Sequence, residues 1–510
     1  MAKLYEAILN KRFCTWFKPD LEQAGGQEGR GCPEQLLTIR LLVDYARKTK
    51  QSLYIMFIDY VKAYDQVDRN LLLRMLASKG CGRNFLRAIA NSFRETVNVI
   101  GSESFLSFRG VKQGAANSCS LFTFYINGTI EKLREVGEDG FLGNLHSLLF
   151  MDDTVILATS RASMEKKLRI LHHAARDISM SMHPTKSQFM TVNVNDNEAF
   201  EIENVRICHT MSYTYLGSSI SNASINEQVK IHIDSKKGHI RKFSAFLKKN
   251  EDAPMKVKRV VLESALKGAI LYGCESWLCG NMRVANTALL YAQKQMLGVR
   301  TQTCTDLVQV ELNTGSAKSL IQQRQKDFFK KAMSHCSYRL SPLCRAVELA
   351  TSAGSPAGRY LQSLLSTTDR PIEKDLETVK ARICQSNSSR RTNYLKFNPD
   401  LSTHPMYADS SVPEADRNAF SQLRLSSHFL KIETGRWARI ERDRRVCTCG
   451  EVQTEEHVLL HCPFTLDARN RHPRLNFIDL KSLMAAENIE LAKFCHLAMK
   501  LTYHRNAGGE

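Results

Sequence analysis

The chain has 510 residues, of which 43% are hydrophobic and 24% are charged, a composition typical of globular proteins rather than disordered ones. Lys and Arg number 71 against 52 Asp and Glu, which gives a formal net charge of +19. This excess favours a polyanionic partner such as nucleic acid, and the alternative on charge alone is a basic protein without such a partner.

The first residues, MAKLYEAILNKRF, lack the apolar core of a secretory signal. No later segment reaches the ~20 apolar residues needed to cross a bilayer. We therefore expect an intracellular protein with no membrane partner. The 15 cysteines are scattered, which predicts reduced thiols packed as small apolar groups, apart from one cluster near the C-terminus.

Apolar residues at helical spacing follow Pro33 and predict a helix that ends at Lys50. Residues 53–58 read LYIMFI, a continuous β-favouring run that predicts a buried strand delivering Asp59 to its end. Residues 70–79 predict a further helix, ended by Gly80.

Residues 147–158 read SLLFMDDTVILA, in which two apolar runs flank two acids. This pattern predicts a β-hairpin that turns at Asp152 and Asp153. Apolar residues from Met164 to Met182 predict a long amphipathic helix that continues until Pro184 stops it. Strands interleaved with helices in this order predict an α+β fold, with an antiparallel sheet covered by helices on one face.

The chain becomes helical and basic over residues 226–278. The basic residues are Lys230, Lys236, Lys237, Arg241, Lys242, Lys248, Lys249, Lys256, Lys258 and Arg259. They could follow a phosphate backbone, and an ordinary solvated helix face is an equal alternative. Residues 350–418 are rich in Ser, Thr, Pro and Asn, which predicts a linker or a loosely ordered segment.

Three acids suit metal-dependent phosphoryl transfer. This reaction uses two divalent cations held a few Å apart, and hard cations prefer carboxylate oxygens. Asp59 at a strand end, with Asp152 and Asp153 at a hairpin turn, could supply those oxygens from adjacent strands. An Asp-Asp turn by itself is more often structural, so the surrounding residues decide.

Those surroundings resemble the palm motifs of non-LTR (LINE-type) retrotransposon reverse transcriptases, because FIDYVKAYDQVDR, GVKQG and FMDD occur in the order of that family. QAGGQEGRGCPEQLLTIR resembles the preceding finger motif, PTKS the lysine-bearing motif, and YLGSSI the primer grip. ALKGAILYGCESW resembles the thumb. The resemblance covers residues 1–280, and several motifs in one order make chance agreement improbable.

The resemblance implies a right-hand polymerase palm with partial fingers, a helical thumb, and a helical C-terminal region with a small zinc-binding module. The expected divisions are partial fingers and palm over 1–210, thumb over 211–300, helical connector and Ser/Pro-rich linker over 301–420, zinc-binding segment over 421–475, and tail over 476–510.

Carried over by position, Asp59 and Asp152 resemble the principal magnesium ligands, and Asp153 resembles their companion acid. Tyr64 is similar to the aromatic residue that closes the sugar pocket and would exclude a 2′-hydroxyl. Simple core packing is the alternative role for Tyr64.

Gln113 and Gly114 match the motif that frames the incoming nucleotide, where a residue without Cβ allows close approach. Lys186 resembles the lysine that assists the departing pyrophosphate, as a cation or proton donor near developing negative charge. An ordinary surface lysine is the alternative.

A second cluster lies in CTCGEVQTEEHVLLHC, where Cys447, Cys449, His457 and Cys462 have a CxC, x7, H, x4, C spacing. Three thiolates and an imidazole could close a tetrahedral structural zinc site, and free thiols are the alternative. His461 could replace His457. The segment resembles the zinc-binding end of LINE-type reverse transcriptases.

A run of arginines precedes this cluster and would give the module a cationic, partly aromatic face for RNA or DNA. These residues are Arg436, Arg439, Arg442, Arg444 and Arg445, beside Trp437.

The sequence departs from the family at several places. The upstream fingers segment is not recognisable, which suggests an N-terminally truncated chain. Gly26 and Gln27 stand where the family usually has Phe-Arg, Met151 replaces the commoner Ala, and GVKQGAANSCSLF lacks the usual Cys-Pro-Leu-Ser. Neither an endonuclease nor an RNase H site is recognisable.

The first functional hypothesis is therefore an RNA-directed DNA polymerase that uses two magnesium ions, an RNA template, a DNA primer or target DNA, and dNTPs. Resemblance further implies target-primed synthesis in the nucleus and a structural zinc ion. The alternative is a catalytically impaired remnant that binds RNA or DNA. A maturase-type splicing cofactor is a third possibility, against which the zinc segment argues.

Overall fold

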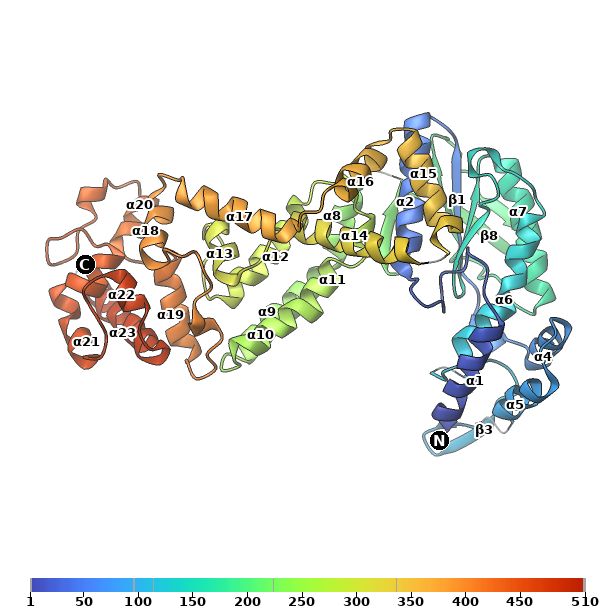
Figure 1. Cartoon of the computed structure of the whole chain (residues 1–510), viewed down its shortest axis with the longest axis horizontal. Coiled ribbons are helices and arrows are strands. Elements are labelled where there is room, and N and C mark those ends of the chain that lie inside the picture. Colours follow the sequence, from blue (N-terminus) through green and yellow to red (C-terminus); the bar gives the residue numbers. More distant parts are fainter. Residues whose placement is uncertain (1, 95–96, 113, 223, 336, 508–510) are drawn as a thin grey trace. The chain divides into compact units, whose positions relative to one another are not determined.

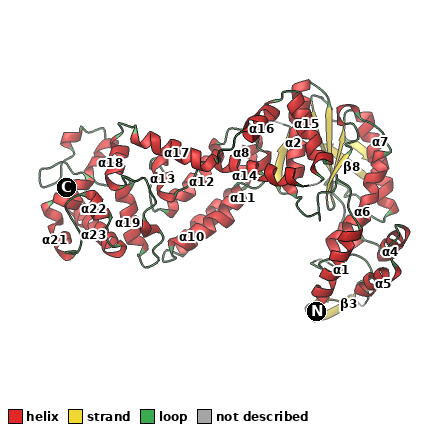
Figure 2. Cartoon of the chain, viewed as in Figure 1, coloured by secondary structure: helices red, strands yellow, loops and turns green. Residues whose placement is uncertain are grey.

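The computed structural model describes residues 2–507 apart from 95–96, 113, 223 and 336. The chain divides into two compact units (Figure 1). The first contains Met1–Gln228, Gly273–Gly280 and Arg324–Thr367, and the second contains Val229–Tyr272, Asn281–Gln323 and Thr368–Glu510. The named strands belong to the first unit, whereas the second is built from helices (Figure 2).

The main sheet of the first unit has six strands in the order β4-β5-β1-β6-β8-β7. Its strands are β1 (Leu53–Ile58), β4 (Ser147–Phe150), β5 (Asp153–Ala158), β6 (Gln188–Val192), β7 (Phe200–Ile202) and β8 (Val205–His209). The predicted strand and hairpin, and the α+β class, are confirmed. The expectation of a purely antiparallel sheet is wrong for one pair, because β6 and β8 run parallel.

Helices cover both faces of this sheet, so the expectation of helices on one face is also wrong. Met56 and Ile58 of β1 face a core shared with α6 (Ser118–Arg134) and α7 (Arg161–Asp177). Ile55 and Phe57 face a second core, shared with α2 (Cys32–Thr49) and α15 (Pro342–Ser352) (Figure 1). The continuous apolar run of β1 reflects burial on both sides, since a half-exposed strand would alternate.

Helix α7 ends at Asp177, earlier than the predicted stop at Pro184. Ser179 adopts a left-handed φ of 55°, which breaks the helix. The following residues then pair with the segment after β1, through a bridge between Tyr60 and Met182 and a hydrogen bond from Val61 N–H to the Ser181 carbonyl. Sheet pairing therefore overrides the helical periodicity of residues 178–182.

The first unit contains further helices and strands. These are α1 (Ala2–Trp16), α3 (Ala63–Gln66), α4 (Arg69–Ser78), α5 (Arg83–Phe93), β2 (Val97–Ile100), β3 (Glu103–Leu106), β9 (Ser212–Tyr215), β10 (Ser218–Ser221), the C-terminal part of α14 (Ala317–Ser334) and α16 (Pro356–Ser366).

The helices of the second unit begin with α8 (Ile225–Ser235), which starts at the boundary, and they confirm the predicted helical character of residues 226–278. They continue as α9 (Lys237–Lys249), α10 (Met255–Val261), α11 (Gly268–Ile270), α12 (Arg283–Met296), α13 (Thr305–Leu312), α17 (Pro371–Cys384), α18 (Ser389–Phe397), α19 (Glu414–Arg424), α20 (Lys431–Trp437), α21 (Leu466–Arg471), α22 (Leu480–Met484) and α23 (Asn488–Ala507).

The expectation of a linker over residues 350–418 is wrong, because most of this segment is helical. Its prolines and serines begin helices. Pro356 occupies the first turn of α16, and the Ser355 hydroxyl accepts a hydrogen bond from Gly358 N–H; Pro371 likewise opens α17. Both residue types favour helix N-termini as strongly as they favour loops. Among the described residues, no helix is both long and apolar enough to span a bilayer.

Candidate functional site

The three predicted acids meet at one end of the sheet in the first unit. Asp59 directly follows β1, Asp152 lies in the β4–β5 turn, and Asp153 begins β5. Strands β1 and β5 are antiparallel, with Ile58 opposite Thr154. The same register places Asp59 opposite Asp153, so residues about ninety positions apart become neighbours.

The acids influence one another electrostatically. Burial, followed by the charges of Asp152 and Asp59, raises the pKa of Asp153 to about 6. Burial and the charge of Asp59 also raise the pKa of Asp152. Each ionised carboxylate disfavours the ionisation of its neighbours, unless a bound cation neutralises their negative charge. The donor set consists of hard carboxylate oxygens, which suits Mg²⁺.

The segment carrying Lys186 fixes Asp59 from one side. Asp59 N–H donates to the Ser187 hydroxyl at 3.1 Å, and the Asp59 carbonyl accepts from His183 N–H at 2.7 Å. Lys186 is exposed in the turn between these two contacts. The structure therefore places Lys186 beside the segment that holds Asp59. Ser187 was not predicted, and its position next to Lys186 was the available signal.

Tyr64 also lies at this site. Its ring stacks on Phe122 of α6, with centroids 4.4 Å apart and an interplanar angle of 11°. Burial, a hydrogen bond to Cys119 and the charge of Asp152 raise the pKa of the Tyr64 hydroxyl. The ring is partly buried and packs against the core cluster that contains Phe122.

The predicted nucleotide-framing motif precedes α6. Gly114 has a φ of +81°, which favours glycine because other residues are strained in that region. An added Cβ would meet open space there, so backbone conformation rather than crowding explains the glycine. Gln113 lies outside the described residues.

A buried glutamine that the sequence did not single out holds the turn beside Asp152. The Gln23 side chain accepts from Met151 N–H at 2.8 Å and donates to the Met151 carbonyl at 3.2 Å. It also accepts from Gly25 N–H at 2.9 Å. The segment before α2 therefore holds the β4–β5 turn in place. The start of the finger motif at Gln23 was the only signal for this role.

Comparison with known proteins agrees with this geometry. Residues 1–220 match the family described as reverse transcriptase (RNA-dependent DNA polymerase). The chain carries a reverse transcriptase domain. This domain is similar to the reverse transcriptases of non-LTR retrotransposons.

Two relatives of this reverse transcriptase domain are Pol polyproteins of retrotransposable elements. The type-1 element R2 of Nasonia vitripennis is 26% identical over 223 residues, which cover 40% of this chain and 22% of the relative. The type-2 element R2DM of Drosophila melanogaster is 26% identical over 171 residues, which cover 32% and 16% respectively. The matched region thus spans about a fifth of the relatives' length.

A solved telomerase from Candida albicans, in complex with the TWJ fragment of telomeric RNA, aligns with 74% of this chain and 56% of that chain. Sequence identity is 10% and the TM-score is 0.33.

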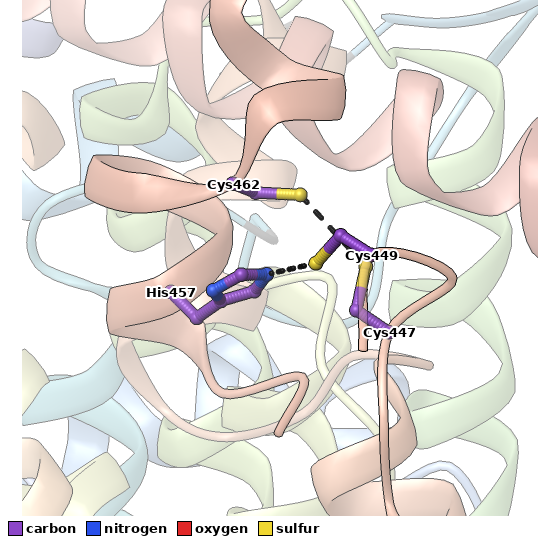
Figure 3. A group of neighbouring side chains, drawn as sticks. All are labelled: Cys447, Cys449, His457 and Cys462. Carbon is purple, nitrogen blue, oxygen red and sulfur yellow. Dashed lines mark hydrogen bonds between the residues drawn. The ribbon is translucent and has the colours of Figure 1, made fainter. Parts of the chain in front are cut away.

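Outside the reverse transcriptase domain, the structure brings the four predicted zinc ligands together (Figure 3). The donor atoms of Cys447, Cys449, His457 and Cys462 all lie within 4.8 Å of one another. Cys449 Sγ is 3.2 Å from His457 Nε2, and Cys447 Sγ is 3.8 Å from Cys462 Sγ. His461 is exposed and does not belong to this group.

Local structure explains why these residues converge. A bridge between Val446 and Val452 closes a tight turn at Gly450, where φ is +97°, and this turn presents the two cysteines of the CxC pair. Burial and the neighbouring Cys447 raise the pKa of the Cys462 thiol to about 11. Three sulfurs and one imidazole nitrogen form the donor set of a structural zinc site.

Proposed function

We propose that this chain is an RNA-directed DNA polymerase of a non-LTR retrotransposon, extending a DNA primer along an RNA template. The convergence of Asp59, Asp152 and Asp153 within a reverse transcriptase domain carries the proposal. In this proposal Asp59 and Asp152, with Asp153 beside them, hold two Mg²⁺ ions. Bound Mg²⁺ would activate the primer 3′-hydroxyl and neutralise the departing pyrophosphate.

The remaining residues position the substrates. Tyr64, stacked on Phe122, limits the room at the sugar and favours a deoxynucleotide. Lys186 places a cation where negative charge develops on the pyrophosphate. Gln23 and Ser187 keep the acids in register by holding the backbone at Met151 and Asp59. In this proposal the nucleotide binds between the strand ends and the start of α6.

Primer extension on a defined RNA template with a DNA primer, dNTPs and Mg²⁺ tests this proposal. We expect extension by the parent chain and a loss of more than about 100-fold in Asp152→Asn, because metal stabilisation contributes several kcal/mol. Asp177→Asn, an exposed acid at the end of α7, is the matched control and should retain activity. Absence of Mg²⁺-dependent extension by folded, RNA-binding parent protein would refute the polymerase activity.

A nucleic-acid-binding role without catalysis is the second candidate, favoured by the basic surface of α9. Lys237, Arg241 and Lys248 are exposed there, while Phe243 and Leu247 are buried. Lys258 does not belong to this surface, because it is buried and pairs with Glu414. Salt-sensitive RNA binding in the absence of any primer extension would favour this second candidate.

We also propose that Cys447, Cys449, His457 and Cys462 bind one structural zinc ion. Four donors within 4.8 Å support a closed site. Elemental analysis should find about one zinc per chain, and less in Cys447→Ser/Cys462→Ser. Cys208→Ser/Cys384→Ser changes two exposed thiols and is the matched control. Equal zinc in the parent and in Cys447→Ser/Cys462→Ser would exclude the site.

Retrotransposon membership suggests target-primed synthesis on chromosomal DNA, and hence a nuclear site of action for this protein. Reverse transcription initiated at a nicked DNA 3′-end, assayed with a partner that supplies the nick, would test the first part. Nuclear fractionation of the expressed chain would test the second.

A further inference from the structure

Two large aromatic rings lie exposed beside the zinc cluster. Phe429 is 56% exposed and Trp437 is 44% exposed, and they meet edge to face with centroids 5.9 Å apart. We call this pair the aromatic platform. Single exposed apolar residues are ordinary, but adjacent exposed aromatic rings are typical of binding surfaces.

The platform is held in place by residues from distant parts of the second unit. The Arg300 guanidinium lies 3.9 Å from the Trp437 ring centroid and 5.5 Å from that of Phe429. Phe429 N–H donates to the Tyr503 hydroxyl at 2.9 Å, and Arg300 N–H donates to the Ser427 hydroxyl at 2.9 Å. The two rings are therefore ordered before any ligand arrives, which reduces the entropy lost on binding.

The surroundings of the platform carry uncompensated positive charge. Glu433, which is 1% exposed, pairs with both Arg390 and Arg436. Arg300 makes no ion pair with any residue that the structure describes, and its Nε is buried without a hydrogen-bond partner there. Two arginines thus share one carboxylate and Arg300 adds a third positive charge, so these four side chains carry a net positive charge.

The loop that follows Trp437 extends this charge into solvent. Residues 437–444 are exposed. The cations of this loop are Arg439, Arg442 and Arg444, of which Arg444 pairs with Glu441 at 3.7 Å, and its other acid is Asp443, so the loop keeps a smaller net positive charge. Arginine binds phosphate in a bidentate manner and also stacks on planar rings. Exposed rings with arginines around them fit a ligand that has flat apolar faces and regularly spaced negative charges.

We propose that the aromatic platform stacks unpaired bases of single-stranded nucleic acid while the surrounding arginines contact its phosphates. A duplex hides the faces of its bases, whereas a single strand offers one face per nucleotide. The proposal rests on the polymerase function above, in which the chain handles RNA template and DNA strands. It assigns Phe429 and Trp437 a role in binding one of these strands.

Fluorescence anisotropy with the full chain tests this proposal, using a labelled 20-nucleotide RNA, the same sequence as single-stranded DNA, and the RNA duplex. Trp437→Ala and Phe429→Ala should each raise the Kd for single strands about 5-fold to 100-fold, the range measured for base stacking. Trp437→Phe should retain most of the affinity. Ile478→Ala, which removes an apolar side chain 79% exposed in the same unit, should leave the Kd unchanged.

Salt dependence separates stacking from charge. The slope of log Kd against log salt should remain that of the parent in Trp437→Ala and fall in Arg439→Gln/Arg442→Gln. A larger effect on RNA identifies the template as the ligand, and a larger effect on DNA identifies the target strand; either supports stacking.

Other results would overturn the proposal. These are unchanged single-strand affinity in both alanine variants, equal losses for single strands and duplex, or loss only of binding to phosphatidylserine vesicles. Zinc content and circular dichroism equal to the parent's show that the variants are folded. Extension of a pre-annealed primer at saturating concentration should persist in Ile478→Ala, and its absence from the parent as well would refute the polymerase function and not the platform.

Discussion

Gly25 lies directly against Met151. A Cβ added at Gly25 would come within 2.5 Å of the Met151 nitrogen and 2.9 Å of its Cγ. At Gly26, which has a φ of +70°, an added Cβ would approach Met151 Cε at 3.2 Å. Two departures from the family pattern, Gly26 and Met151, are therefore mutual neighbours, and the larger residue occupies room left by the glycines.

We expect Gly25→Ala to destabilise the first unit by about 1–3 kcal/mol, because the new methyl group meets backbone atoms that Gln23 holds in place. Primer extension should fall as well, since displacement of Met151 also displaces Asp152. Urea denaturation measures the change in stability. Gly128→Ala is the control: an added Cβ in α6 meets no atom within 4 Å, so it should stabilise by up to about 1 kcal/mol. Equal effects of the two variants would contradict the steric explanation.

Asp152→Asn should stabilise the metal-free protein at pH 8 while abolishing catalysis. Burial and the neighbouring acids raise the pKa of Asp153 to about 6, so the ionised acids disfavour the folded state above that pH. Removing one charge relieves the repulsion. We expect a rise in Tm of about 1–3 °C by thermal denaturation in EDTA.

The gain in Tm expected for Asp152→Asn depends on pH. The gain in Tm should shrink as pH falls through about 6 and vanish near the ordinary carboxyl pKa of about 4, where the parent is protonated too. Saturating Mg²⁺ should reverse the order by stabilising the parent selectively. A gain in Tm independent of both pH and Mg²⁺ would rule out charge repulsion as its cause.

Tyr64→Val should weaken discrimination against ribonucleotides. The ring stacked on Phe122 would no longer fill the space that a 2′-hydroxyl needs. We expect the ratio of kcat/KM for dNTP over rNTP to fall by about 10-fold to 200-fold, as for other pockets that select by size. Tyr64→Phe keeps the ring and should preserve the ratio. A ratio unchanged in Tyr64→Val would assign the tyrosine to core packing.

His457→Ala should lose zinc, whereas His461→Ala should retain it. His457 Nε2 lies 3.2 Å from Cys449 Sγ, while His461 is exposed outside the cluster. Zinc per chain, measured by elemental analysis after gel filtration, distinguishes the two variants. Loss of zinc in both, or in His461→Ala alone, would contradict this ligand set.

Arg424→Leu should destabilise the second unit by about 3–5 kcal/mol, because it leaves a buried carboxylate without its cation. Arg424 Nε donates to Glu311 at 2.6 Å, and both side chains are almost fully buried. Urea denaturation measures the loss. The control Arg370→Ala breaks an exposed pair with Glu373 and should change stability by less than about 1 kcal/mol. Similar losses of stability in Arg424→Leu and Arg370→Ala would show that the buried pair contributes no more to stability than an exposed pair.

Local patterns predicted the elements that carry the reverse transcriptase site. The run LYIMFI specified β1 with its observed bounds, and the acids between two apolar runs specified the β4–β5 hairpin. Ordered motifs predicted that Asp59 and Asp152 belong to one site, although no local signal gives their distance. Prediction from sequence failed where one residue pattern is compatible with two kinds of structure. Pro356 and Pro371 indicated a linker by composition but begin helices, because proline suits both settings.

By itself, the sequence determined the chemistry available to this protein: three carboxylates, a tyrosine, a lysine, and a Cys/His set at zinc-ligand spacing. Tertiary structure decided which of them meet. Register between β1 and β5 brings Asp59 to Asp153, and a π-helical turn buries His457 and exposes His461. The Arg300 side chain contacts the ring of Trp437, although the two residues are more than a hundred positions apart in the sequence. Such contacts depend on long-range packing, which local periodicity does not encode.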